Sequence, residues 1–201
     1  MTASGPRLAP LPPEHTPELG DQFASFFKTL GFVPNSVLTM QRKPALVRAF
    51  VAMQAAIWSP DSKVDRGLKR LIAFAASRAT RDAYSMAHTA SGALHFGIDP
   101  AKLAALADFP ASPRFTDAEK SALALAVAAS VVPNGVTDAM FADLRAHWSE
   151  EQMVEIVATI AMAGFLARWN GTMATPLEDE PREVAQKHLA PQGWSAGKHG
   201  A

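Results

Sequence analysis

The apolar residues of this 201-residue chain recur at spacings of three and four, and its β-branched residues never form an alternating run. Spacings of three and four place side chains on one face of a helix, whereas a half-buried strand needs a spacing of two. The segment 16–30 shows the pattern in its apolar positions Leu19, Phe23, Phe26, Phe27 and Leu30. The sequence therefore predicts an all-α fold of about eight helices.

Capping signals divide the chain into these helices. A Ser, Thr or Asp before an apolar run, followed three residues later by an acid or its amide, is typical of a helix start, and glycine is typical of a helix end. We expect a capping box at Ser62 and Asp65 to open the helix 63–78. The other expected helices span about 17–30, 44–58, 82–96, 116–132, 137–147 and 150–170, with short helical segments at 34–40, after Asp99 and at 181–189.

Composition divides the chain into three parts. Residues 1–15 are rich in proline and predict an extended N-terminal arm. Residues 16–176 hold the apolar helices and are long enough to bury one core, so we expect a single domain there. Residues 177–201 predict a polar C-terminal tail whose last residues are mobile.

Charge and cysteine content exclude several classes of protein. Nineteen basic and nineteen acidic residues give no net charge, which argues against a generally basic nucleic-acid binder. No uncharged run is long enough to cross a bilayer and no signal peptide is evident, so we expect a cytoplasmic protein without a membrane partner. The chain has no cysteine, so it has no disulfide, thiolate metal site, cysteine nucleophile or thiol peroxidase chemistry.

One helix face carries the best candidates for chemistry. Tyr84, His88, Ser91 and His95 lie on the same side of the helix expected at 82–96. A buried tyrosine–histidine pair can perform general acid/base catalysis near neutral pH. Alternatively, the two side chains satisfy each other, or a backbone carbonyl, in a packed core. His88 and His95 are too far apart along the helix axis to share a metal ion, and we predict no metal and no cofactor.

Other candidate residues have more ordinary interpretations. Arg70 lies on the helix 63–78, where it would face solvent or form an ion pair. Trp169 would belong to the core or to a subunit interface, and secondarily, with Met173, to the wall of an apolar pocket. Glu151 and Glu155 lie near the start of the longest helix, where acids usually interact with the helix dipole and solvent.

Three segments together resemble a known superfamily. Residues 68–99, LKRLIAFAASRATRDAYSMAHTASGALHFGID, are similar to the core of the carboxymuconolactone decarboxylase and alkylhydroperoxidase D superfamily, and in particular to its peroxidase-related subgroup. Residues 31–50 and 166–181 resemble the segments on either side of that core. The resemblance implies an alkylhydroperoxidase D-like helical bundle that assembles as a homo-oligomer, a trimer or a hexamer, and places His88 on the family histidine.

The chain departs from that superfamily where peroxidases do their chemistry. Counting back from His88, the two redox cysteines of the family fall on Arg81 and Tyr84. A one-residue slip moves them to Asp82 and Ser85, again without a thiol, and the relay glutamate falls near Lys69 or Arg70. Peroxide reduction by a thiolate needs a nucleophilic sulfur, so this activity is excluded for the chain.

Two functions remain. The first is a cofactor-independent acid/base enzyme, a decarboxylase, lyase or isomerase acting on a small lactone or an aromatic-derived carboxylate. His88 would be its general base or acid, Tyr84 would bind His88 or the substrate, and Arg81 or Arg70 would hold a carboxylate. The alternative is a non-catalytic oligomeric scaffold or small-ligand binder that has lost the ancestral reaction.

Overall fold

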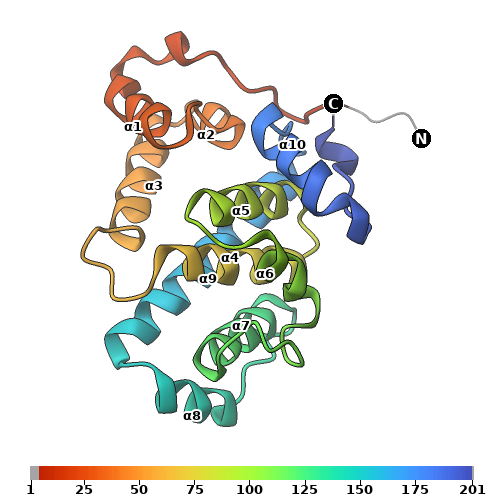
Figure 1. The fold of residues 1–201 in the computed structure, drawn as a ribbon. Helices are drawn as coiled ribbons and strands as arrows, with labels where there is room; N and C mark the ends of the chain where they lie inside the picture. Colours follow the sequence, from red (N-terminus) through yellow and green to blue (C-terminus); the bar gives the residue numbers. More distant parts are fainter. Residues whose placement is uncertain (1–4, 201) are drawn as a thin grey trace.

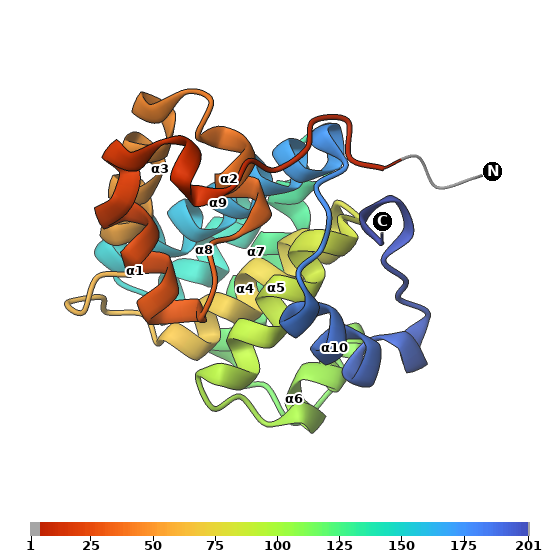
Figure 2. The same cartoon turned by 90° about the horizontal axis from the view of Figure 1, so that it is seen from above.

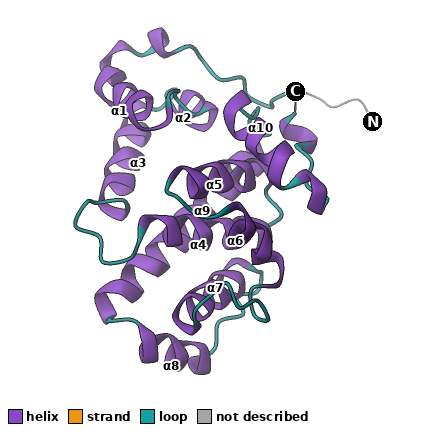
Figure 3. Cartoon of the chain, in the orientation of Figure 1, coloured by secondary structure: helices purple, strands orange, loops and turns teal. Residues whose placement is uncertain are grey.

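Helices account for all the regular structure in residues 5–200, the part of the chain that the computed structural model describes (Figure 3). This range contains ten α-helices and no strand, which confirms the all-α prediction. The helices are α1 (Gly20–Leu30), α2 (Asn35–Met40), α3 (Pro44–Ile57), α4 (Arg66–Ala79), α5 (Ala83–His95), α6 (Pro100–Ala105), α7 (Asp117–Ser130), α8 (Asp138–His147), α9 (Glu150–Met173) and α10 (Asp179–His188).

Helix α4 lies at the centre of the fold and packs against α5, α7 and α9 (Figure 1). On α5, the residues Ala87, Ala90 and Ala93 are fully buried, and their small side chains let the backbones of neighbouring helices approach closely. Helices α1 to α3 lie together on one side, α7 and α8 lie at one end, and α10 lies along α5 (Figure 1, Figure 2). This arrangement brings the C-terminal part of the chain onto α5.

Two apolar clusters stabilise the fold, and α9 contributes to both. The larger one surrounds α4 and includes Leu71 and Ile72 together with Ile156 of α9. The smaller one joins α1, α2 and α3 to Met162, one and a half turns further along α9. Because α9 spans 24 residues, it connects the two clusters as a single rigid element.

Residues of the expected capping types begin and end several helices, but the capping box expected at Ser62 is wrong. The boxes at Thr116–Glu119 and Ser149–Gln152 have both of their hydrogen bonds, and α5 is followed by Gly97 in the left-handed region at φ 82°. Helix α4, however, begins at Arg66 and is capped by Asp65, whose carboxylate accepts from the backbone N–H of Leu68 at 2.9 Å. Ser62 is not a cap because its hydroxyl contacts two charged side chains in the interior.

The C-terminal segment is packed, and the expectation of a mobile end is wrong for the residues described. Trp194 is 9% exposed and donates its indole N–H to the carbonyl of Ala83 at 3.1 Å. His199 is 2% exposed, and its backbone carbonyl accepts from Leu177 N–H at 2.8 Å. Burial of these two large rings holds the segment against the start of α5, which the polar composition concealed. Ala201 lies outside the described residues.

The N-terminal arm also contacts the domain. Residues 1–4 lie outside the described range, but Arg7 N–H donates to the carbonyl of Met173 at 2.9 Å and Leu11 N–H to that of Leu38 at 3.2 Å. Within residues 5–200, no helix has both the length and the apolar character needed to cross a membrane. The expected homo-oligomer stays a prediction.

Candidate active site

A carboxylate joins the two residues that the sequence singled out on α5. His88 Nε2 lies 2.6 Å from Glu178 Oε2, and the Tyr84 hydroxyl donates to Glu178 Oε1 at 2.8 Å. The backbone N–H of Asn35, the first residue of α2, donates to the same Oε1 at 2.5 Å. Glu178 therefore fixes α2, α5 and the start of α10 to one another.

Local backbone geometry delivers Glu178 to this position. Helix α9 ends at Ala174 in the left-handed region, at φ 49°, and the chain then reverses towards α5. Glu178 is the extended N-cap residue of α10, which packs along α5. The amide of Asn35 donates to the carbonyl of Pro176 at 2.9 Å and holds the connecting segment against α2.

The electrostatics of the site keep Glu178 ionised and Tyr84 protonated. Burial by itself raises the pKa of Glu178, but the neighbouring His88 and the hydrogen bonds from His88, Asn35 and Tyr84 outweigh it and lower the pKa below its usual value. Burial and the adjacent carboxylate raise the pKa of Tyr84 well above its usual value. Tyr84 thus acts as a neutral hydrogen-bond donor to an anion.

The second ring nitrogen of His88 is free. Nδ1 makes no hydrogen bond to residues 5–200, and the side chain is 18% exposed. The ring of Tyr84 stacks on the imidazole with centroids 4.4 Å apart, and that of Phe32 meets it edge-on at 5.9 Å. When Nε2–H donates to the carboxylate, Nδ1 of the neutral imidazole carries the lone pair. The site therefore offers one positioned base with a route to solvent.

A second carboxylate, that of Glu155 on α9, lies against α4, although the sequence predicted for it only an interaction with the helix dipole and solvent. Glu155 Oε2 lies 2.6 Å from Lys69 Nζ, whose side chain is 0% exposed, and it also accepts from the Ser62 hydroxyl. Burial opposes ionisation of Glu155, but hydrogen bonds from Lys69, Ser62 and two backbone N–H groups lower its pKa to about 2. The charge of Lys69, which lies near the position of the relay glutamate in the resembled superfamily, is thus neutralised by Glu155 of α9.

Arg70 has a different environment. Its guanidinium lies over the ring of Trp58 at 4.1 Å and near that of Phe96 at 5.8 Å, and it forms no ion pair within residues 5–200. Its Nε is buried without a hydrogen-bond partner. Burial lowers the pKa of Arg70 to about 10, so it is cationic at neutral pH. Arg70 is half-buried, and of the two interpretations the pairing with an acid is wrong.

The remaining sequence candidates lie apart from Glu178. Arg81 is exposed in the loop before α5, with a left-handed backbone at φ 55°. Trp169 stacks on Phe165 at 6.3 Å and packs against the smaller apolar cluster, with its indole nitrogen buried and unpartnered. Met173 ends α9 beneath the N-terminal arm. The structure brings Tyr84 and His88 together and adds Glu178, which the sequence analysis missed because it is 90 residues away.

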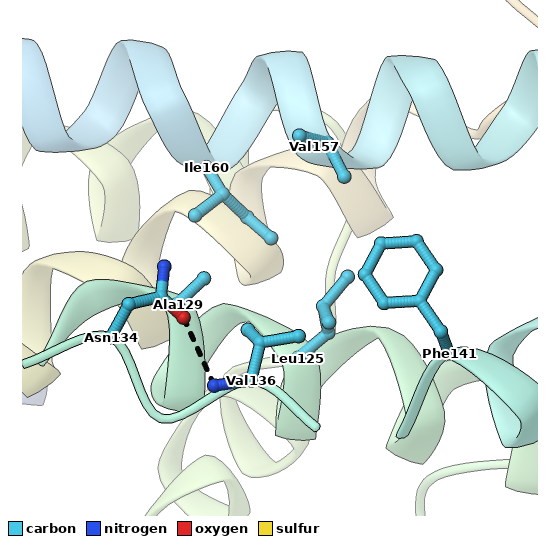
Figure 4. A pocket seen from close by; sticks show the side chains of 7 residues that line it. All are labelled: Leu125, Ala129, Asn134, Val136, Phe141, Val157 and Ile160. Atoms are coloured by element: carbon cyan, nitrogen blue, oxygen red, sulfur yellow. Dashed lines mark hydrogen bonds between the residues drawn. The ribbon is translucent and has the colours of Figure 1, made fainter. Parts of the chain in front are cut away.

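The cavities described lie elsewhere in the molecule. One, an open pocket of about 180 Å³, is lined by α7, α8, α9 and the loop before α8 (Figure 4). Its lining is largely apolar and comprises Leu125, Ala129, Asn134, Val136, Phe141, Val157 and Ile160. Among residues 5–200, no three His, Asp or Glu side chains gather as a metal site would require. The absence of a metal and of a cofactor stays a prediction.

Comparison with known proteins identifies the family. The model of the carboxymuconolactone decarboxylase family matches residues 44–128. The debrominase Bmp8, solved alone and, as a variant, with 2,3,4-tribromopyrrole, is 33% identical with a TM-score of 0.83 over 90% of this chain and 96% of its own. A peroxidase-related protein with an alkylhydroperoxidase AhpD core from Ralstonia eutropha JMP134 has a TM-score of 0.77 at 22% identity, over 89% and 95% of the two chains, and shows the same fold.

A further relative is the uncharacterized protein YnjA of Escherichia coli K12, which is 42% identical over 77 residues. That match covers 38% of this chain and only 42% of YnjA, so less than half of that relative is compared. The debrominase match extends over nearly the whole of both chains, and the family model matches the residues from α3 into α7. The chain therefore belongs to the carboxymuconolactone decarboxylase family, as a member that contains no cysteine.

Proposed function

We propose that this protein is a cofactor-independent acid/base enzyme of the decarboxylase, lyase or isomerase type, acting on a small lactone or an aromatic-derived carboxylate. The observation that carries the proposal is the free Nδ1 of His88, on a ring whose other nitrogen is held by an ionised carboxylate. A carboxylate in this position fixes the tautomer and orientation of the imidazole and stabilises its protonated form. His88 is then the catalytic residue, and Glu178 and Tyr84 are positioning residues.

The chemistry balances without an external oxidant or reductant. As a base, Nδ1 removes a proton from a carbon next to a carbonyl, and the electron pair of the broken C–H bond forms an enolate. In a decarboxylation the electrons of the broken C–C bond stay on that carbon as CO2 leaves, and His88 in its protonated form returns a proton to it. Proton transfer by a positioned side chain contributes roughly 10²–10⁴-fold to the rate.

The family adds support of a general kind. Bmp8 is named a debrominase, so a fold this similar serves a reaction other than peroxide reduction. The absence of cysteine from the chain leaves an imidazole, a carboxylate and a phenol as the reactive groups gathered at α5.

A non-catalytic ligand binder is the second candidate. It is favoured by the hydrogen bonds around Glu178, because a carboxylate bound by His88, Tyr84 and Asn35 also explains how α2, α5 and α10 are held together. In that case His88 would stabilise the fold, and its replacement would lower stability without removing any activity.

Deuterium exchange into carbon-bound positions distinguishes the two candidates. A thermal-shift screen with aromatic acids, muconolactone-type lactones and hydroperoxides first identifies a class of ligand. Exchange or turnover of those compounds is then followed by NMR in D2O for the wild type and for His88→Gln. We expect His88→Gln to lower the rate at least ~100-fold.

His147→Gln is the matched control, because His147 also lies near a carboxylate, that of Asp143 at 3.9 Å, but on the surface of α8. It should leave the rate unchanged. Full activity in His88→Gln, or no exchange with any compound in the wild type, would contradict the proposed enzymatic function and favour the non-catalytic binder.

A further inference from the structure

Arg70 presents hydrogen-bond donors that the chain leaves unused. The guanidinium stacks on Trp58 and makes no hydrogen bond or ion pair with residues 5–200, and its Nε is fully buried. Arginine carries five N–H donors, and a buried donor without an acceptor destabilises the folded protein. A cation in such a position is suited to an anion that arrives from outside the chain.

The surroundings of Arg70 favour a planar anion. Trp58 covers one side of the guanidinium at 4.1 Å, and Phe96 lies 5.8 Å away and is 39% exposed. Arg66, one turn earlier on α4, lies 5.9 Å from the same Phe96 ring and likewise forms no ion pair within residues 5–200. Arg66 donates to the backbone carbonyl of Trp58 at 3.4 Å, whereas the guanidinium of Arg70 has no such partner. An unpaired guanidinium beside aromatic rings attracts a flat molecule with a negative charge.

The side chain of Arg70 extends from α4 onto α5, which brings it close to the proposed base. His88, Gly92 and Phe96 follow one another at intervals of four residues and so form one ridge along α5. Arg70 crosses this ridge at Gly92, where a Cβ atom would lie 2.9 Å from both Cδ and Nε of the arginine. Residues four apart on a helix have Cβ atoms about 5–6 Å apart, so the crossing point is one turn from His88. One small molecule can therefore span both.

We propose that Arg70, with Trp58 and Phe96, forms a subsite that binds the carboxylate of a planar, aromatic or conjugated ligand and orients its reacting carbon towards His88. Arginine binds carboxylates through two parallel N–H donors, and this geometry fixes the orientation of the ligand as well as its charge. This inference rests on the proposed function for its substrate class. The absence of a side chain at Gly92 then serves a purpose, since it leaves room for Arg70 above the ridge.

Equilibrium binding of benzoate tests the subsite without requiring turnover. Calorimetric titration of the full chain should show saturable binding of benzoate, and the uncharged benzamide should bind much more weakly. Arg70→Met keeps an unbranched stem over Trp58 and should weaken benzoate binding at least roughly tenfold, the loss expected for a charged hydrogen-bonded pair. Arg66→Met is the matched control, because it removes the same charge beside the same Phe96 ring. It should weaken binding at most a few-fold.

Gly92→Ala provides a second variant that keeps the charge. The added methyl group forces Arg70 to move, whereas alanine has a higher helix propensity than glycine, so benzoate binding should fall in a protein that remains folded. The inference is overturned if benzoate shows no saturable binding at millimolar concentration, if benzamide binds equally well, or if Arg66→Met and Arg70→Met have the same effect.

His88→Gln separates this inference from the proposed function. It should retain benzoate binding even where it abolishes exchange, because Arg70 does not depend on the imidazole. Benzoate binding that requires Arg70, in a protein without any exchange activity, would support the subsite and contradict the proposed enzymatic function. Exchange that requires His88, with no effect of Arg70→Met on benzoate binding, would support the proposed enzyme and overturn the subsite.

Discussion

Glu178 and Glu155 are bound in similar ways, but their nitrogen partners, His88 and Lys69, differ. Each carboxylate accepts several hydrogen bonds, each has a pKa below its usual value, and each joins the α4–α5 pair to a distant part of the chain. Glu155 is paired with Lys69 at 2.6 Å, and Glu178 with His88 at the same distance.

The difference lies in the hydrogen-bonding groups that each partner leaves unused. The ammonium group of Lys69 has three donors, and all are used, by Glu155, by the hydroxyl of Ser62 and by the carbonyl of Ile57 at 2.7 Å. His88 uses one ring nitrogen and keeps the other. A fully satisfied ion pair can hold helices together, whereas a partly satisfied one can also react. We therefore assign stability to the first pair and chemistry to the second.

The largest expected effect is on stability and belongs to the Lys69 pair. Glu155→Gln leaves an ammonium group that is 0% exposed without its counter-charge. Loss of one partner from a buried pair typically costs about 3–5 kcal/mol. We expect the free energy of unfolding, measured by urea titration, to fall by about that amount.

A double variant identifies the cause of this loss. Lys69→Met combined with Glu155→Gln removes both charges, and it should recover much of the stability because no charge is then left unpaired. If Glu155→Gln alone cost less than about 1 kcal/mol, the pair would behave as an exposed one, and the contrast with Glu178 would disappear.

The same variant predicts a dependence on pH. The pKa of Glu155 is about 2 in the folded protein and 4.5 in the unfolded chain. As the pH falls, the unfolded chain therefore binds a proton at Glu155 before the folded protein does. The stabilisation from Glu155 is fully present above about pH 4.5 and is lost between there and about pH 2. The difference in unfolding free energy between wild type and Glu155→Gln should therefore shrink over this window. A constant difference from pH 7 to pH 2 would show that ionisation of Glu155 does not contribute.

Local signals predicted most of the fold. The spacing of apolar residues and the capping residues act within a few positions of one another, so helices such as α7 and α9 could be recognised with their N-termini. Ser62 misled the prediction because the pattern of a capping box does not reveal a competing partner, here Lys69 and Glu155. The C-terminal segment was misjudged since the burial of Trp194 and His199 depends on α5, far away in the sequence.

The site was predictable only in part, for the same reason. Tyr84 and His88 are four residues apart on one helix, and the sequence paired them correctly. Glu178 reaches them through the reversal at Ala174 and the packing of α10, neither of which leaves a local signal. Glu178 belongs to the acidic run 178–180 after Leu177, a pattern that indicates only an ordinary helix start. Arg70 was a candidate for holding a carboxylate, but its environment could not be predicted because its neighbours, Trp58 and Gly92, come from two other segments.

The smallest expected effects come from removing one hydroxyl from each pair. Tyr84→Phe deletes a donor to Glu178, and Ser62→Ala deletes one to Glu155. A hydrogen bond to a charged group contributes about 1.5–3 kcal/mol, so each change should be measurable and neither should unfold the protein. If Glu178 serves catalysis and Glu155 serves stability, Tyr84→Phe should alter turnover and Ser62→Ala should alter only stability.

Tyr84→Phe should lower turnover by roughly tenfold and move the acid limb of the rate–pH profile to higher pH, because a carboxylate that loses a donor has a higher pKa. Ser62→Ala should lower the urea midpoint and leave the rate–pH profile where it is. A purely structural Tyr84 would shift the midpoint without moving the profile, and that result would place the Glu178 pair in the same class as the Lys69 pair.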